Sequence, residues 1–429
     1  MTADVSAARP SRDAGVILMG GVAAFCVYLS MYAFRKPFAA AAYEGVVGWS
    51  AVVDFKVALV VAQVVGYALS KLAGVKLISE LNGARRGAAI LGLIGVSWLA
   101  LVLFAVVPPG WKVFALFLNG LPLGLIWGLV FSYLEGRRTS EVLGAILCAS
   151  FIVASGVVKS VAVWLMTDRG VTEWWMPAAT GLLFMPLLAL SVAGLSRMPP
   201  PDAADIAERV ERRPMYAAQR RDFLRRYGFG VLMLVLAYVM LTALRDFRDN
   251  FAAEIWIELG YEGVSSVFTA SELPVAAISL AALGALMLLR DNRQALMAIH
   301  AITGFGLALI GLSTVAFQHG LLAPLPWMIA SGAGLYLAYT PFNAMLFDRL
   351  IAATRQVGTA GFLIYLADAS GYLGSVVLTL TRNLATVSMP WLSFFMASAV
   401  WSSIIGCVLT IISAVYFSRK LRLRSLGVT

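Results

Sequence analysis

Long apolar runs recur along the whole chain and limit the folds that it can adopt. Twelve of them are long enough, at about 20 residues or more, to cross the hydrocarbon core of a bilayer as a helix. With 60% hydrophobic and 13% charged residues, the composition is also far from that of a soluble domain. The sequence therefore predicts an all-α, multi-pass membrane protein. The predicted spans are 14–43, 50–78, 86–107, 111–134, 140–166, 174–197, 228–258, 264–289, 294–317, 323–350, 355–381 and 389–417.

The distribution of Lys and Arg predicts the orientation of these spans. With the N-terminus inside, the predicted outer loops hold only Lys112, Arg169 and Arg382, and the other loops and the C-terminal tail are rich in arginine. Positive charge accumulates on the cytoplasmic side of membrane proteins. We expect a protein of the cell inner (cytoplasmic) membrane with both termini cytoplasmic. The net charge of +10 then reflects topology and contact with anionic membrane lipid, and no nucleic-acid motif accompanies it.

A polar, arginine-rich segment divides the chain into two similar halves. Residues 1–197 are predicted to form an N-terminal six-helix bundle, 198–227 a cytoplasmic linker and 228–429 a C-terminal six-helix bundle. FRKPFAA at 34–40 recurs as FRDNFAA at 247–253, and ASGVVKS at 154–160 recurs as ASGYLGS at 369–375. Two matches at nearly the same spacing indicate a duplicated unit with parallel copies.

Two parallel six-helix repeats with a long central loop resemble the major facilitator superfamily (MFS) along the whole chain. The resemblance implies a monomeric secondary transporter that works by alternating access. SELNGARRG at 79–87 is similar to the loop motif of that superfamily in a degenerate form, with Glu80, Arg85 and Arg86 where the superfamily has an Asp-Arg pair and further basic residues. The resemblance gives Glu80 a part in gating.

The first span resembles one MFS family more closely, the organophosphate:phosphate antiporters. The matching segments are YAFRKPFAAA in span one, GYALSKLAG at 66–74 and IYLADASGYLGS at 364–375. Pro37 stands where that family has Asn, which the second copy, FRDNF, keeps. The resemblance implies that Arg35 and Arg248 hold the anionic group of a small solute across a central cavity.

Charged residues inside the spans are candidates for function, because a charge near the bilayer centre costs roughly 2.5 to 3.5 kcal/mol. Arg35 and Arg248 occupy matching positions of the two repeats, although a structural arginine that bridges helices is the alternative. Arg245 could replace Arg248 or pair with a neighbouring aspartate. Lys36 is expected either to be a ligand or to have a structural or gate-lining role.

Further charges are candidates for gating or coupling. Lys159 and Glu272 are expected at similar depth on helices that adjoin in this fold, which predicts an ion pair. Asp368 is expected either to pair with Lys56 or Gln63 of the second span or, if desolvated, to couple transport to protons.

Polar-tipped side chains complete the set of candidate solute contacts, which are Tyr32, Trp127, Tyr339, Asn343 and Tyr365. His300 is expected to be a packed structural residue. Gly120, Gly124 and Gly128 form a small-residue face that lets helices approach closely.

No catalytic, nucleotide or metal motif is present in the sequence, so we expect no enzyme activity, cofactor or metal. The favoured interpretation is a secondary active transporter of a small anionic solute, such as an organophosphate, phosphate or carboxylate. A proton-coupled carrier that uses Asp368 or Glu272 is one alternative. A transporter-like sensor of a phosphorylated ligand is the other.

Overall fold

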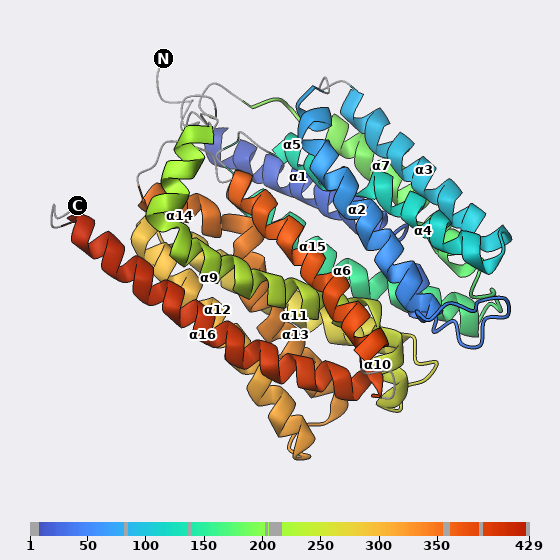
Figure 1. Cartoon of the computed structure of the whole chain (residues 1–429). Coiled ribbons are helices and arrows are strands. Elements are labelled where there is room, and N and C mark those ends of the chain that lie inside the picture. Colours follow the sequence, from blue (N-terminus) through green and yellow to red (C-terminus); the bar gives the residue numbers. More distant parts are fainter. Residues whose placement is uncertain are drawn as a thin grey trace. The chain divides into compact units, whose positions relative to one another are not determined.

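A computed structural model of the 429-residue chain describes residues 8–80, 85–134, 137, 139–201, 205, 217–354, 361–385 and 389–425. The regular elements of these residues are helices throughout (Figure 1). The chain divides into two compact units. Unit 1 comprises Met1–Arg209 with Glu262–Ala270, and unit 2 comprises Val210–Tyr261 with Ser271–Thr429. The all-α membrane fold is confirmed, whereas the predicted domain limits stay a prediction, and most of the predicted linker lies outside the described residues.

Unit 1 is built from the first helices of the chain. They are α1 (Ala8–Tyr32), the short 3₁₀ helix η1 (Pro37–Ala40), α2 (Phe55–Glu80), α3 (Arg86–Val106), α4 (Pro109–Leu123), α5 (Ile126–Leu134), α6 (Ser140–Thr167) and α7 (Met176–Ser196). In this unit α2 packs on α4, α3 packs on α4, and α1 packs on α6 and α7.

Unit 2 follows with longer helices and more interruptions. Its helices are α9 (Ala217–Asn250), α10 (Ala252–Glu258), α12 (Asn292–Gln318), α13 (Pro324–Pro341), the π-helical turn η3 (Phe342–Leu346), α14 (Phe347–Ala353), α15 (Gly361–Ala385) and α16 (Trp391–Ser425). The helix α11 (Ser266–Met287) has its first residues in unit 1 and the rest in unit 2. Figure 1 shows α9 between α15 and α16, and α9 packs on both.

Eight helical stretches of the described residues are long and apolar enough to span a membrane. One of them, Pro109–Leu134, joins α4 and α5, and a shorter apolar helix covers Ile17–Tyr32. The number of membrane spans, twelve, therefore stays a prediction. Four of the predicted spans are interrupted in the part of the chain that the structure describes. The first ends its α-helix at Tyr32, the fourth turns between α4 and α5, the seventh breaks at Phe251, and the tenth passes through η3.

Glycines allow α2 and α4 to approach closely, as predicted for the glycine face of the fourth span. A Cβ atom added to Gly120 would overlap the carbonyl oxygen of Gln63, and one added to Gly124 would overlap Ser70 and Tyr67. Gly66 on α2 faces the backbone of α4 in the same way. The close approach brings the polar side chains of α2 and α4 next to the end of α1.

Candidate functional site

Helix α1 stops three residues before Arg35. The backbone turns there, with the nitrogens of Arg35 and Lys36 both bonded to the carbonyl of Tyr32, at 3.0 and 2.9 Å. Pro37 has no backbone N–H to donate, and a proline disfavours helical geometry at the residue before it. The prediction that Arg35 and Lys36 continue a membrane-spanning helix is therefore wrong, because the RKP sequence ends the helix inside the protein and starts η1.

Buried side chains bind the carbonyl groups that the break leaves without helical partners. Gln63 Nε2 donates to the carbonyl oxygen of Arg35 at 2.8 Å, and Asn119 Nδ2 donates to that of Phe34 at 2.9 Å. Lys56 Nζ donates to the carbonyl oxygen of Ala39 at 3.0 Å. Irregular backbone at membrane depth is tolerated only where protein or water satisfies it. These three side chains fix the broken segment in place.

Two of the anchors, Gln63 on α2 and Asn119 on α4, are bonded to each other, and Asn119 is also bonded to Ser97 on α3. Gln63 Nε2 also donates to Asn119 Oδ1 at 2.7 Å, and Asn119 Nδ2 donates to Ser97 Oγ at 2.6 Å. The side chains of Gln63, Asn119 and Ser97 are all buried. A fully satisfied buried network holds its members in one arrangement, since any displacement leaves a polar group unpaired.

Aromatic rings surround the side chain of Arg35. Its guanidinium carbon lies 3.8 Å from the ring centre of Tyr67 and 5.8 Å from that of Tyr32. Tyr28 continues the cluster, with ring centres 5.6 Å from Tyr32 and 5.1 Å from Trp127. The structure thus brings together Arg35, Tyr32 and Trp127, three of the candidates from the sequence. A guanidinium over an aromatic face keeps its charge and gains an orientation.

The interior of unit 1 is positively charged. Among the described residues of this unit, the buried charged side chains are all cations, namely Arg35, Lys36, Lys56, Lys112 and Lys159. Lys112 Nζ donates to the carbonyl oxygen of Phe104 at 2.6 Å, and Lys159 Nζ donates to Ser155 Oγ at 3.1 Å. Buried charge of one sign is costly in a medium of low dielectric constant.

Unit 2 contains a second polar cluster around Tyr238, which the sequence analysis missed. The hydroxyl of Tyr238 donates to Asp368 Oδ1 at 2.7 Å and lies 3.2 Å from the hydroxyl of Tyr339. Asn343 Nδ2 donates to the same hydroxyl at 3.3 Å. The candidates Tyr339, Asn343 and Asp368 therefore meet at one residue. Its position seven residues before Arg245, on one face of α9, was the signal that could have identified it.

Arg245 joins this cluster through a ring contact. Its guanidinium carbon lies 4.3 Å from the ring centre of Tyr339, and its Nη2 lies 2.6 Å from Asp246 Oδ1. The predicted alternative, a pair between Arg245 and its neighbouring aspartate, is confirmed. Asn343 lies in η3, and π-helical turns are frequent at functional sites.

Arg248 has a carboxylate partner in its own unit. Its Nη1 donates to Glu272 Oε1 at 2.6 Å, and its Nη2 donates to the carbonyl oxygen of Met328 at 3.1 Å. Both charged side chains are buried. Because Glu272 neutralises this guanidinium, a contact between Arg248 and a solute stays a prediction. Lys159 belongs to the other unit, so its pairing with Glu272 stays a prediction too.

The remaining candidates have structural roles or have side chains that the structure does not describe. Lys56 and Gln63, which were predicted as partners of Asp368, bind the backbone segment that follows α1. His300 Nδ1 lies 2.7 Å from the carbonyl oxygen of Leu296 and Nε2 lies 3.0 Å from Ser413 Oγ, as expected for a packed structural histidine. The side chains of Tyr365 and Glu80 lie outside the described residues.

Similar solved structures define the class of this fold. A bacterial homologue of the human lysosomal transporter Spinster, inward-facing and unoccupied, matches with a TM-score of 0.57 and 13% identity, covering 95% of this chain and 97% of that one. A mutant of the peptide transporter POT in complex with sulfate matches with a TM-score of 0.60 and 14% identity, covering 95% of each chain. A bacterial homologue of the human drug peptide transporters matches with a TM-score of 0.63 and 14% identity, covering 95% and 99%. The chain has the fold of the MFS transporters.

Within that fold the family is given by a direct match of sequence. The chain belongs to the family of unknown function DUF5690, whose model matches residues 37–420. Among curated proteins, no sequence relative matches. The closer resemblance to organophosphate:phosphate antiporters is not confirmed.

Proposed function

We propose that this protein is a secondary active transporter of a small anionic solute, an organophosphate, phosphate or carboxylate, that works by alternating access. The observation that carries the proposal is the charge of the unit 1 interior, where the buried charged side chains of the described residues are all cationic. The predicted location, the inner membrane with both termini cytoplasmic, belongs to the same proposal.

The anionic group of the solute is bound by Arg35, with Lys36 beside it. A guanidinium presents five N–H donors in a rigid fork that matches phosphate and carboxylate oxygens. The Tyr67 ring at 3.8 Å orients this fork, and the Gln63 bond at 2.8 Å fixes the backbone beneath it. Preorganised donors bind more tightly, since less conformational freedom is lost when the ligand arrives.

The buried cations also explain how binding of the solute would shift the conformational equilibrium of the protein. A ligand shifts a conformational equilibrium only by its differential affinity for the two states. An anion bound beside Arg35 and Lys36 stabilises most strongly the state in which those charges are most desolvated. That state is the occluded one in an alternating-access cycle, because water then screens the cations least.

Proton coupling through Asp368 is the second candidate function, and one contact favours it. Asp368 is buried and accepts a hydrogen bond from Tyr238 at 2.7 Å. Glu272, the other carboxylate considered, is held by Arg248 at 2.6 Å.

Counterflow in proteoliposomes tests the proposal. Vesicles that contain the full chain are loaded with an unlabelled anion, and uptake of the same labelled anion is followed, with phosphate, glycerol phosphate, a sugar phosphate and a dicarboxylate each tested in turn. We expect exchange with at least one of them and a loss of about tenfold or more in Arg35→Lys, because the fork contributes roughly 1.5 to 3 kcal/mol per charged hydrogen bond. Binding without exchange would indicate a sensor instead.

The matched control for this experiment is Arg382→Lys. Arg382 is also buried, and its guanidinium carbon lies 3.6 Å from the ring centre of Trp391. The substitution of lysine for arginine is therefore chemically the same as at Arg35. Arg382 belongs to unit 2 and donates to the carbonyl oxygen of Met389 at 3.2 Å. We expect this control to retain exchange.

A further inference from the structure

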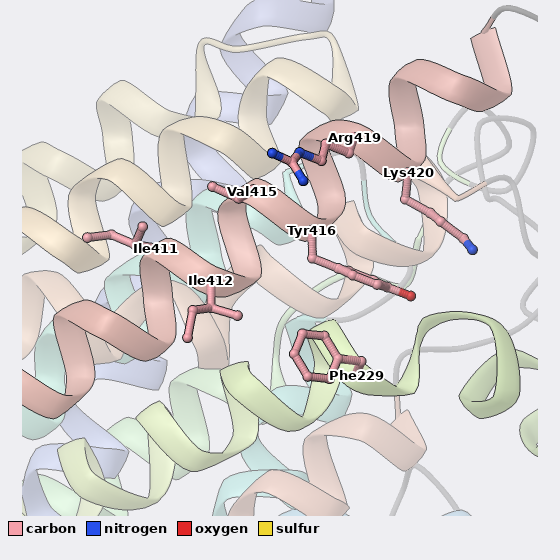
Figure 2. Close-up of a pocket in the computed structure, with 7 residues that line it drawn as sticks. All are labelled: Phe229, Ile411, Ile412, Val415, Tyr416, Arg419 and Lys420. Atoms are coloured by element: carbon pink, nitrogen blue, oxygen red, sulfur yellow. The ribbon is translucent and has the colours of Figure 1, made fainter.

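An apolar groove with a basic end lies on unit 2 between α9 and α16 (Figure 2). It has a volume of about 480 Å³ and is lined by Phe229, Ile411, Ile412, Val415, Tyr416, Arg419 and Lys420. Figure 2 shows the aromatic ring of Phe229 on α9 and the side chains of Ile412 and Tyr416 on α16. Its volume is in the range of small-ligand sites.

The walls of this groove are large apolar side chains that the protein itself leaves exposed. Phe229 is 54% exposed, Ile411 is 59% exposed and Val415 is 43% exposed. Exposed apolar side chains continue along both helices on the side away from the basic end of the groove, among them Leu232 on α9 and Val408 on α16. In a membrane-spanning protein such a surface faces acyl chains.

The two helices are held together at the basic end. The hydroxyl of Tyr416 donates to the backbone carbonyl of Arg226 at 2.8 Å, and the rings of Tyr416 and Phe229 have centres 5.6 Å apart. The groove wall is therefore formed by a fixed pair of helices. A rigid wall orders a bound chain at a lower entropic cost than a flexible one would.

Cationic side chains gather where the groove ends. Arg419 and Lys420 line it, and further exposed arginines, Arg220, Arg221, Arg225 and Arg226, lie on the same end of α9. Asp222 is the acidic residue between them in the sequence. Positive charge near a membrane surface attracts anionic lipid, at about 1 kcal/mol for each Lys or Arg. The charge at this end thus complements a phosphate group.

We propose that the groove is a binding site for one anionic phospholipid, with an acyl chain along Ile411, Ile412 and Phe229 and the phosphate bound by Arg419 and Lys420. The apolar side chains and the cationic pair line the same groove, so a single molecule with a chain and a charged head satisfies both. A soluble anion would leave the apolar wall unused, and a lipid without net charge would leave the excess cations without a counter-charge.

Native mass spectrometry of the purified full chain tests this site with phosphatidylglycerol and phosphatidylcholine of identical acyl chains. We expect wild-type protein to retain phosphatidylglycerol in preference to phosphatidylcholine. The double variant Arg419→Gln and Lys420→Gln should reduce phosphatidylglycerol affinity by about tenfold or more, since two charges near the headgroup are removed. Phosphatidylcholine retention should change little.

Two further variants keep the test decisive. Arg290→Gln with Arg293→Gln removes the same charge from the exposed start of α12 and the loop before it, and should leave phosphatidylglycerol retention unchanged. Ile412→Trp fills the groove with all cations intact and should weaken retention of phosphatidylglycerol. The proposal is overturned if the groove double variant binds phosphatidylglycerol as wild type does, if the distant double variant loses as much, or if Ile412→Trp has no effect.

Discussion

Asn119 on α4 donates a hydrogen bond of 2.9 Å to the carbonyl oxygen of Phe34, the residue before Arg35 in the chain. The same amide nitrogen donates to Ser97 Oγ on α3, and the amide oxygen accepts from Gln63 on α2. One side chain therefore connects α2, α3 and α4 to the backbone segment that follows α1. The position of Arg35 depends on this link, because the backbone on both sides of it is held by these amides.

Replacement of Asn119 should destabilise the protein. Asn119→Leu keeps a branched side chain of four heavy atoms but leaves the Phe34 carbonyl and one Gln63 proton without their partners. Each buried group left unsatisfied costs about 1 to 3 kcal/mol, so we expect a clear fall in the midpoint of thermal unfolding in detergent. Gln318→Leu, which changes an exposed amide at the end of α12, is the control and should change the midpoint little.

The ion pair of Arg248 and Glu272 should be required for a stable unit 2. Glu272→Gln leaves a buried guanidinium without its counter-charge, and loss of one partner of a buried pair costs about 3 to 5 kcal/mol. We expect a large fall in the thermal midpoint. The exposed Glu262→Gln makes the same chemical change and should be neutral. Arg248→Met with Glu272→Met should recover most of the loss, because neither charge then remains buried.

A charge swap separates this pair from the one predicted from the sequence. Arg248→Glu with Glu272→Arg should be more stable than either single change. If instead Lys159→Glu with Glu272→Lys restores stability and the first swap does not, Lys159 is the functional partner of Glu272. Equal recovery by both swaps would show that the three charges act together.

Proton coupling, if Asp368 provides it, should be separable from exchange. Asp368→Asn keeps the size of the side chain and the bond from Tyr238 but cannot titrate. We expect it to abolish uptake driven by a pH gradient and to leave counterflow intact, with Asp222→Asn on the exposed start of α9 as the control. Equal loss of both activities would identify Asp368 as a structural residue.

Glu173, in the loop between α6 and α7, should make stability depend on pH. Burial raises the pKa of this carboxyl, and the nearby Lys112 opposes that rise only in part. The folded protein then favours the neutral form, so the contribution of Glu173 to stability is full below its unfolded pKa of about 4.3 and is lost as the pH rises through the folded pKa. Glu173→Gln should therefore raise the thermal midpoint relative to wild type at pH 7 and lose that advantage at pH 4. The exposed Glu44→Gln removes the same charge and should show no such crossover.

The fold was predictable from the sequence because hydrophobicity alone identifies membrane helices. The glycine face of the fourth span also identified a helix contact, since only glycine permits the approach of α4 to α2. The interruptions were harder to predict. Pro37 and Pro341 adjoin a break and a π-helical turn, whereas Pro274 lies within the uninterrupted α11, so a proline in a span does not by itself show whether the helix breaks.

The candidate site was predictable in its residues and less so in their partners. Arg35, Tyr32 and Trp127 were named from the sequence and lie in one cluster, but the anchor Asn119 and its partner Ser97 were not. A single buried amide side chain on an apolar helix belongs to no sequence motif or hydrophobic periodicity. Its role becomes visible only in the structure, where it faces backbone carbonyls that the end of a helix leaves without partners. Glu272 was recognised from the sequence as a buried charge. Two cations, Lys159 and Arg248, were possible partners at similar depth, and burial alone does not show which of them pairs with it.

Anion-dependent thermal stabilisation of the purified full chain, wild type against Arg35→Lys, tests the central claim most directly. A ligand at 100 times its dissociation constant stabilises the protein by about 2.7 kcal/mol, so an anion that binds the cationic interior of unit 1 should raise the wild-type midpoint by several degrees. We predict such a rise with at least one of phosphate, glycerol phosphate, a sugar phosphate or a dicarboxylate, and its loss in Arg35→Lys but not in Arg382→Lys. A rise of equal size in wild type and Arg35→Lys would contradict the account.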